Sequence, residues 1–122
     1  MPAALLLATT PAQAAGTTKV VYTGDGGSVK GGKAVFAGST DPERFQVCDT
    51  EADGMAARAY FSWSGSSHPE LTLMDNNGAT SFCVGGEFLA ERQIPENTTV
   101  QITVCRVSAG WDQDCVVDWG RA

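Results

Sequence analysis

The chain has 122 residues, 43% hydrophobic and 18% charged, a composition that suits one globular domain with an apolar core. Acidic residues outnumber basic ones by 14 to 8, for a net charge of −6, and lysines and arginines do not cluster. Nucleic acids and anionic membranes need a basic face on their partner, so the sequence excludes both classes, and no run is long enough to insert into a membrane.

The N-terminal residues 1–14 have the pattern of a signal peptide. A short apolar run covers residues 3–8, and Ala12-Gln13-Ala14 matches a small-x-small cleavage site, which places the cut before Ala15. No positive segment precedes the apolar run, so the signal reads as truncated. We expect a secreted, extracellular protein; an apolar tail that is not a signal is the alternative.

Residues 15–32 form a Gly-rich N-terminal arm that includes one candidate strand, "KVVYT". A flexible arm of this kind can dock on a partner as an added strand. Val20, Val21 and Tyr22 would then offer backbone pairing, with side chains on alternate sides. An ordinary first strand followed by a loop is the alternative.

The remaining residues, 33–122, alternate between apolar and polar side chains, with turn residues between the runs and almost no helix periodicity. Together with the run at 19–23, the pattern predicts strands at 33–38, 44–50, 55–64, 71–75, 80–88, 99–107 and 115–119. Seven or eight short strands at this spacing predict an all-β fold, a small antiparallel, Ig-like β-sandwich.

The alternation also assigns faces to the clearest strands. In the segment 55–64, Phe61 and Trp63 share the inward face, whereas Arg58 and Tyr60 lie on the other. In the segment 99–107, the apolar residues point inward, and the outward residues are Gln101, Thr103 and Cys105.

Four cysteines, Cys48, Cys83, Cys105 and Cys115, follow the export signal. An even number in a small exported domain predicts two disulfides, for which three pairings are possible. Zinc is disfavoured, because there is no C-x-x-C pair and a single histidine. We favour Cys48–Cys83 and Cys105–Cys115, the second closing the hairpin-like segment "CRVSAGWDQDC".

The segment "VCDTEADGM" resembles the start of a calcium loop, with Asp49, Glu51 and Asp53 as ligands. An EF-hand loop needs a carboxylate at its twelfth position, which here is Tyr60, and strands rather than helices flank the segment. The residue types also suit a turn between strands. We therefore predict a turn and no metal or other cofactor; a looser, weak calcium site is the alternative.

No catalytic residues emerge, and we expect a non-catalytic protein. The only histidine, His68, lies in the loop "SSHPE", where adjacent residues rarely form a catalytic triad. Among the aromatic residues, Trp63 is expected in the core. Trp111 sits inside the predicted Cys105–Cys115 loop, where it is poorly placed for the core and is a candidate contact residue.

The segments "FQVCDTEADGMAARAYF" and "IPENTTVQITVCRV", with Cys115 and Trp119 after them, carry a family resemblance over about residues 40 to 119. In strand pattern and cysteine placement the chain resembles small exported two-disulfide β proteins of high-GC Gram-positive bacteria, most of them without an assigned activity. The resemblance implies one function in particular, that of the small adaptor subunit of umbrella toxin particles, which joins lectin-bearing spokes to a large antibacterial toxin.

The sequence thus favours a secreted, non-catalytic protein-interaction module with a secreted protein partner, for which an adaptor subunit is the specific hypothesis. Val20, Val21, Tyr22 and Trp111 are the expected partner-binding residues. A small carbohydrate-binding module using exposed Trp and Tyr is the first alternative. A secreted protease inhibitor, with the stapled loop held rigid for a protease cleft, is the second.

Overall fold

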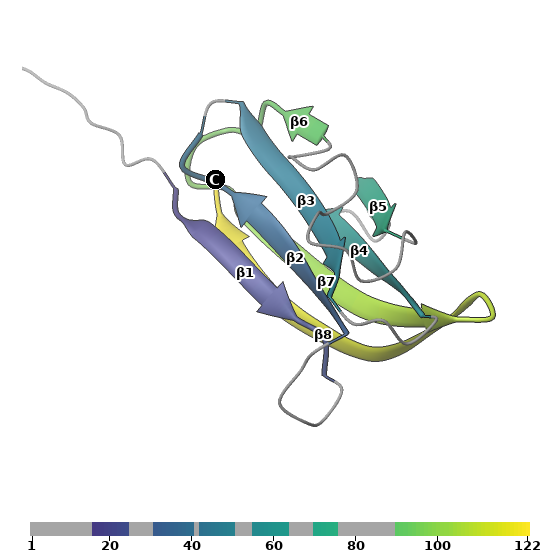
Figure 1. Cartoon of the computed structure of the whole chain (residues 1–122). Coiled ribbons are helices and arrows are strands. Elements are labelled where there is room, and N and C mark those ends of the chain that lie inside the picture. Colours follow the sequence, from purple (N-terminus) through teal and green to yellow (C-terminus); the bar gives the residue numbers. More distant parts are fainter. Residues whose placement is uncertain (1–15, 25–30, 41, 51–54, 64–69, 76–89) are drawn as a thin grey trace, which may run out of the picture.

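A computed structural model of the chain describes residues 16–24, 31–40, 42–50, 55–63, 70–75 and 90–122. These residues form eight strands, β1 (Thr18–Tyr22), β2 (Gly32–Ala37), β3 (Glu43–Asp49), β4 (Ala56–Ser62), β5 (Leu71–Asp75), β6 (Ala90–Arg92), β7 (Thr99–Ser108) and β8 (Trp111–Arg121). The strands make two layers (Figure 1). The prediction of an all-β fold is confirmed, and seven of its strands coincide with or overlap observed ones.

The first sheet has the antiparallel order β1-β2-β3-β6. Val21 of β1 lies opposite Ala34 of β2, which lies opposite Val47 of β3, and all three side chains face the core. The short strand β6 was not predicted, since three residues cannot display an alternation. An ion pair of 3.0 Å between Arg44 and Glu91 accompanies its pairing with β3.

The second sheet has the antiparallel order β5-β4-β7-β8. The central pair is β4 and β7, the two strands with the most regular alternation in the sequence. Ala59 of β4 lies opposite both Leu73 of β5 and Val104 of β7, and Val104 lies opposite Val116 of β8. The inward face of this sheet is therefore apolar, as the alternation predicts.

Aromatic rings join the two sheets at the centre of the core. The ring of Phe45 on β3 lies 5.3 Å from that of Phe36 on β2 and 4.8 Å from that of Phe61 on β4. Trp63 stacks on Phe45 at 5.7 Å and packs against the core cluster, which confirms its predicted place. Aromatic residues each bury a large apolar area, so these contacts help to hold the two layers together.

The connectivity differs from that of immunoglobulin domains, in which the first, second, fifth and fourth strands form one sheet. Here the first three strands are neighbours in one sheet. The immunoglobulin-like description therefore applies to the two-layer arrangement and not to the strand order. The part of the chain that the structure describes contains no helix long and apolar enough to cross a membrane.

Candidate functional site

The hairpin formed by β7 and β8 is closed by a two-residue turn and a disulfide. Ser108 pairs with Trp111, and the turn residues Ala109 and Gly110 have φ angles of 51° and 83°. Two positive φ angles are the requirement of a type I′ turn, which matches the twist of the flanking strands. Below it, the disulfide Cys105–Cys115 links the two strands, as predicted, with the Cα atoms 4.1 Å apart.

A β-bulge lies between the turn and the disulfide. The register shifts between Val104 and Arg106, and Asp114 has a φ of 53°. One extra residue on β8 reverses the side to which the side chains between the turn and the bulge point. As a result, Asp112 lies on the same face as the disulfide, whereas alternation places Trp111 on the opposite side. The guanidinium of Arg106 pairs with the Asp114 carboxylate at 3.1 Å.

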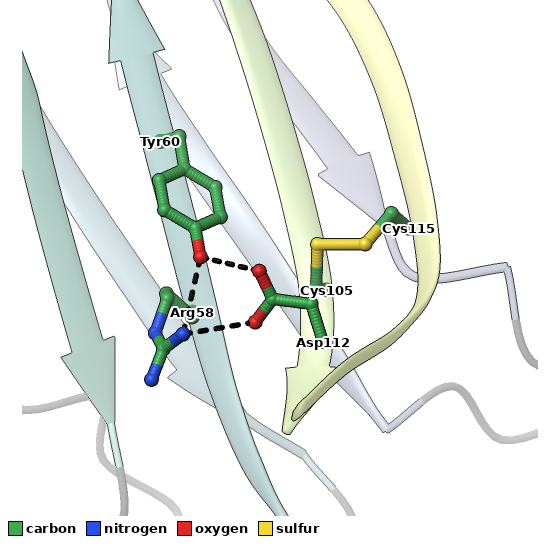
Figure 2. The surroundings of a disulfide bond; sticks show 5 residues. All are labelled: Arg58, Tyr60, Cys105, Asp112 and Cys115. Atoms are coloured by element: carbon green, nitrogen blue, oxygen red, sulfur yellow. Dashed lines mark hydrogen bonds and ion pairs between the residues drawn. A yellow bond between two sulfur atoms is a disulfide. The ribbon is translucent and has the colours of Figure 1, made fainter. Parts of the chain in front are cut away.

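Asp112 joins a polar cluster on the outward face of the second sheet (Figure 2). Its Oδ1 lies 3.0 Å from Nη1 of Arg58, and its Oδ2 accepts a hydrogen bond from the Tyr60 hydroxyl. Nη1 of Arg58 also donates to the Tyr60 oxygen at 3.1 Å, and Nη2 donates to the Met74 sulfur at 3.7 Å. The cluster ties the β8 hairpin to β4 across β7, so it fixes the hairpin against the sheet.

The cluster changes the titration of its members. Burial raises the pKa of the Tyr60 hydroxyl, and the hydrogen bond to Asp112 adds to that rise. The hydrogen bond to Tyr60 raises the pKa of Arg58, and the nearby Asp112 contributes in the same direction. Tyr60 therefore keeps its proton, and its hydrogen bond to Asp112, to a higher pH than a free tyrosine does.

Farther along β8, the outward face carries a second exposed indole. Trp119 is 55% exposed and lies opposite Gln101 of β7, and Val117, 42% exposed, lies opposite Thr103. The residues of β8 that alternate with Val117 and Trp119 face the opposite sheet. At Gly120, for example, an added Cβ would come within 2.8 Å of the Phe36 ring in the core.

Asp118, between these two exposed residues, is held by two contacts. It accepts the Trp119 backbone N–H at 2.8 Å and pairs with Lys19 of β1 at 3.2 Å. The hydrogen bond from Trp119 lowers the pKa of the Asp118 carboxyl, with Lys19 as a further cause. The pair also joins β8 to β1, the edge strand of the other sheet (Figure 1).

The structure separates the predicted partner-binding residues. Val20, Val21 and Tyr22 belong to β1, whose backbone pairs with β2. Val21 is buried in the core, whereas Val20 and Tyr22 are 41% and 49% exposed. Trp111 is 75% exposed at the start of β8. The N–H of Gly24, two residues after Tyr22, donates to the Asp114 carbonyl, which connects the end of β1 to the hairpin.

The candidate calcium segment is described only at its start. Asp49 is buried at the end of β3, and its backbone N–H donates to Oδ2 of Asp75. The flanking segments are strands, as predicted, but Glu51 and Asp53 lie outside the described residues. His68, Cys83 and the strand predicted at 80–88 also lie outside them. Among the described residues, no group of three or more His, Cys, Asp or Glu could hold a metal ion.

Sequence reasoning missed Asp112 of this face, and it counted Trp119 among the aromatic residues that could form a binding face without assigning it to a side of the sheet. Trp119 could have been placed, because Cys105 was assigned outward and paired with Cys115; alternation from Cys115 then turns Val117 and Trp119 outward. Asp112 carries no such signal, since its side depends on a bulge that no residue type in the segment announces.

No protein-family model, no curated protein and no solved structure matches this chain.

Proposed function

We propose that the chain is a secreted, non-catalytic protein-interaction module that binds its partner through the β7–β8 hairpin. The observation that carries the proposal is the exposure of Trp111. Its side chain is 75% exposed beside a type I′ turn, in a hairpin whose two strands are linked by a disulfide. Aromatic anchors of this kind dominate the binding energy of protein interfaces. A disulfide is also consistent with an oxidising compartment, as the proposed export requires.

The hairpin is rigid before it meets a partner. The Cys105–Cys115 disulfide fixes its two strands, and the contacts of Asp112 with Arg58 and Tyr60 hold it against β4. Binding therefore costs less conformational entropy than the ordering of a free loop would. The tight two-residue turn favours a protruding anchor over the extended loop that a protease cleft accepts.

The adaptor hypothesis needs a second contact surface, and β1 offers one. Val20 and Tyr22 are exposed on β1, and the Gly24–Asp114 hydrogen bond ties the end of this strand to the hairpin. Because β1 is an edge strand that contributes Val21 to the core, a partner would meet it as part of the folded domain. We also propose that Cys48 and Cys83 form a second disulfide. This disulfide requires the proposed export to an oxidising compartment.

The test is capture of a partner from the organism's own culture medium. Tagged native protein should retain a secreted protein, which mass spectrometry identifies and which is then produced alone to measure affinity. Trp111→Ala should weaken binding at least tenfold, about 1.4 kcal/mol, and Tyr22→Ser should weaken it less. Deleting residues 15–30 is unsuitable, because it removes β1 and with it Val21 of the core.

Trp119→Ala is the matched control, since it removes an exposed indole from the other side of β8. This variant should bind the partner as the native protein does. If no secreted protein is captured, or if Trp111→Ala binds the identified partner with native affinity, the proposal fails.

A further inference from the structure

Part of the outward face of the second sheet consists of two rows of side chains from three neighbouring strands. Ser62 of β4, Gln101 of β7 and Trp119 of β8 lie opposite one another in one row. Tyr60, Thr103 and Val117 form the next row. Each row therefore runs from β4 to β8 across the strands and ends on an exposed apolar group of β8, the Trp119 indole or the Val117 side chain.

None of these six side chains carries a formal charge at neutral pH. Arg121 is the next outward residue of β8 after Trp119 and adds one positive charge at the end of this face. Arg58 is paired with Asp112 at 3.0 Å, and Asp118, which lies between Val117 and Trp119 in sequence, is paired with Lys19 at 3.2 Å. A neutral ligand would leave both of these ion pairs in place.

The polar groups of the face can each donate and accept. Hydroxyl groups come from Ser62 and Thr103, and the Gln101 amide adds two donors and an acceptor beside the Trp119 indole. A sugar ring has the complementary chemistry, with C–H groups that pack on an aromatic face and hydroxyls that both donate and accept.

We propose that this face is a second binding site, for a neutral glycan chain that stacks on Trp119. The chain runs along the rows, with hydrogen bonds to Gln101 and Thr103. The ring of Tyr60 provides a further apolar contact on β4, two strand spacings or about 10 Å from β8. The hydroxyl of Tyr60 is held by Asp112 and Arg58, which keeps this ring in place (Figure 2). The site is separate from the protein contact proposed for Trp111.

Affinity electrophoresis tests the proposal in gels that contain hydroxyethylcellulose, xylan, galactomannan or mixed-linkage β-glucan, with pull-downs on insoluble cellulose and chitin. The folded native protein should be retained by at least one of these neutral polysaccharides. Trp119→Ala should weaken that retention at least tenfold, Gln101→Ala should weaken it less, and Trp119→Phe should keep part of it. A melting curve of each variant shows whether it is folded.

Trp111→Ala is the control here, and it should bind the polysaccharide as the native protein does. Trp119→Ala should therefore lose glycan binding and keep protein binding, whereas Trp111→Ala should do the reverse. The two proposals can thus be contradicted independently. The glycan proposal is overturned if no neutral polysaccharide is bound or if folded Trp119→Ala binds as well as native. It is equally overturned if the only ligand is an acidic polysaccharide that salt releases, or if Trp119 is instead required for capture of a protein.

Discussion

The hydroxyl of Tyr60, on β4, donates a hydrogen bond to the carboxylate of Asp112, on β8, across the intervening strand β7. The contact depends on the bulge at Asp114, which turns Asp112 toward the outward face of the sheet. The orientation of the hairpin therefore depends on contacts among β4, β7 and β8 and not on the turn alone.

This contact predicts a loss of stability at alkaline pH. The folded-state pKa of Tyr60 is raised above the unfolded value of about 10, so its contribution is complete below pH 10. The contribution is lost as the pH rises through the folded-state pKa, because the unfolded chain releases the proton first. Urea unfolding between pH 9 and 11 should therefore show a steeper decline for native protein than for Tyr60→Phe; equal slopes would contradict the assignment.

The same pair can be observed directly by absorbance of the tyrosinate near 295 nm. The chain has two tyrosines, so Tyr22→Phe leaves Tyr60 as the only reporter. In that background, Asp112→Asn should lower the pKa of Tyr60, since the Asp112 carboxylate contributes to raising it. A titration that does not move, or that moves upward, would show that the two groups do not interact in solution.

The disulfides predict a defined mass and a defined stability. Oxidised protein should be about four hydrogens lighter than reduced protein, since each of two disulfides removes two. Peptide mapping should link Cys105 to Cys115 and Cys48 to Cys83. Replacing Cys105 and Cys115 together with Ala should lower the free energy of unfolding by about 3 kcal/mol, as expected for a short closed loop. Free thiols in the secreted protein would contradict the proposed export.

The type I′ turn predicts a stabilising substitution. Ala109 has a φ of 51°, a region that costs a residue with a Cβ about 1 kcal/mol. Ala109→Gly or Ala109→Asn should therefore raise the free energy of unfolding by about that amount in thermal or urea unfolding. Gly110→Ala is the opposite test: nothing lies within 4 Å of the added Cβ, so any loss must come from its φ of 83°.

At Gly120, in contrast, adding a methyl group is expected to destabilise the protein. A methyl group there would lie 2.8 Å from the Phe36 ring, and close packing leaves little room for the ring to move. Gly120→Ala should lower the free energy of unfolding by about 1–3 kcal/mol. If it were neutral, the inward orientation of Gly120, and with it the outward orientation of Trp119, would be in question.

The turn predicted at residues 49–54 implies that calcium does not change the thermal stability of the protein. A ligand that binds only the folded state raises its melting temperature, so a chelator should leave the melting temperature unchanged if no site exists. A calcium-dependent rise of several degrees that disappears in Asp53→Ala would establish the looser site instead.

The sequence by itself determined most of the strands, their inward faces and the disulfide of the hairpin. These features are local, because period-two alternation assigns a face to each residue, and the short segment between Cys105 and Cys115 already predicts a hairpin. The core place of Trp63 follows from the same alternation.

Only the tertiary structure decided which side chains meet on the surface. The contact of Asp112 with Arg58 and Tyr60 needs the strand order β4-β7-β8 and a one-residue bulge, and neither leaves a periodic signal in the sequence. The pairing of β1 with β2 likewise places Val21 in the core, because burial of a strand depends on which neighbours and which opposite sheet enclose it.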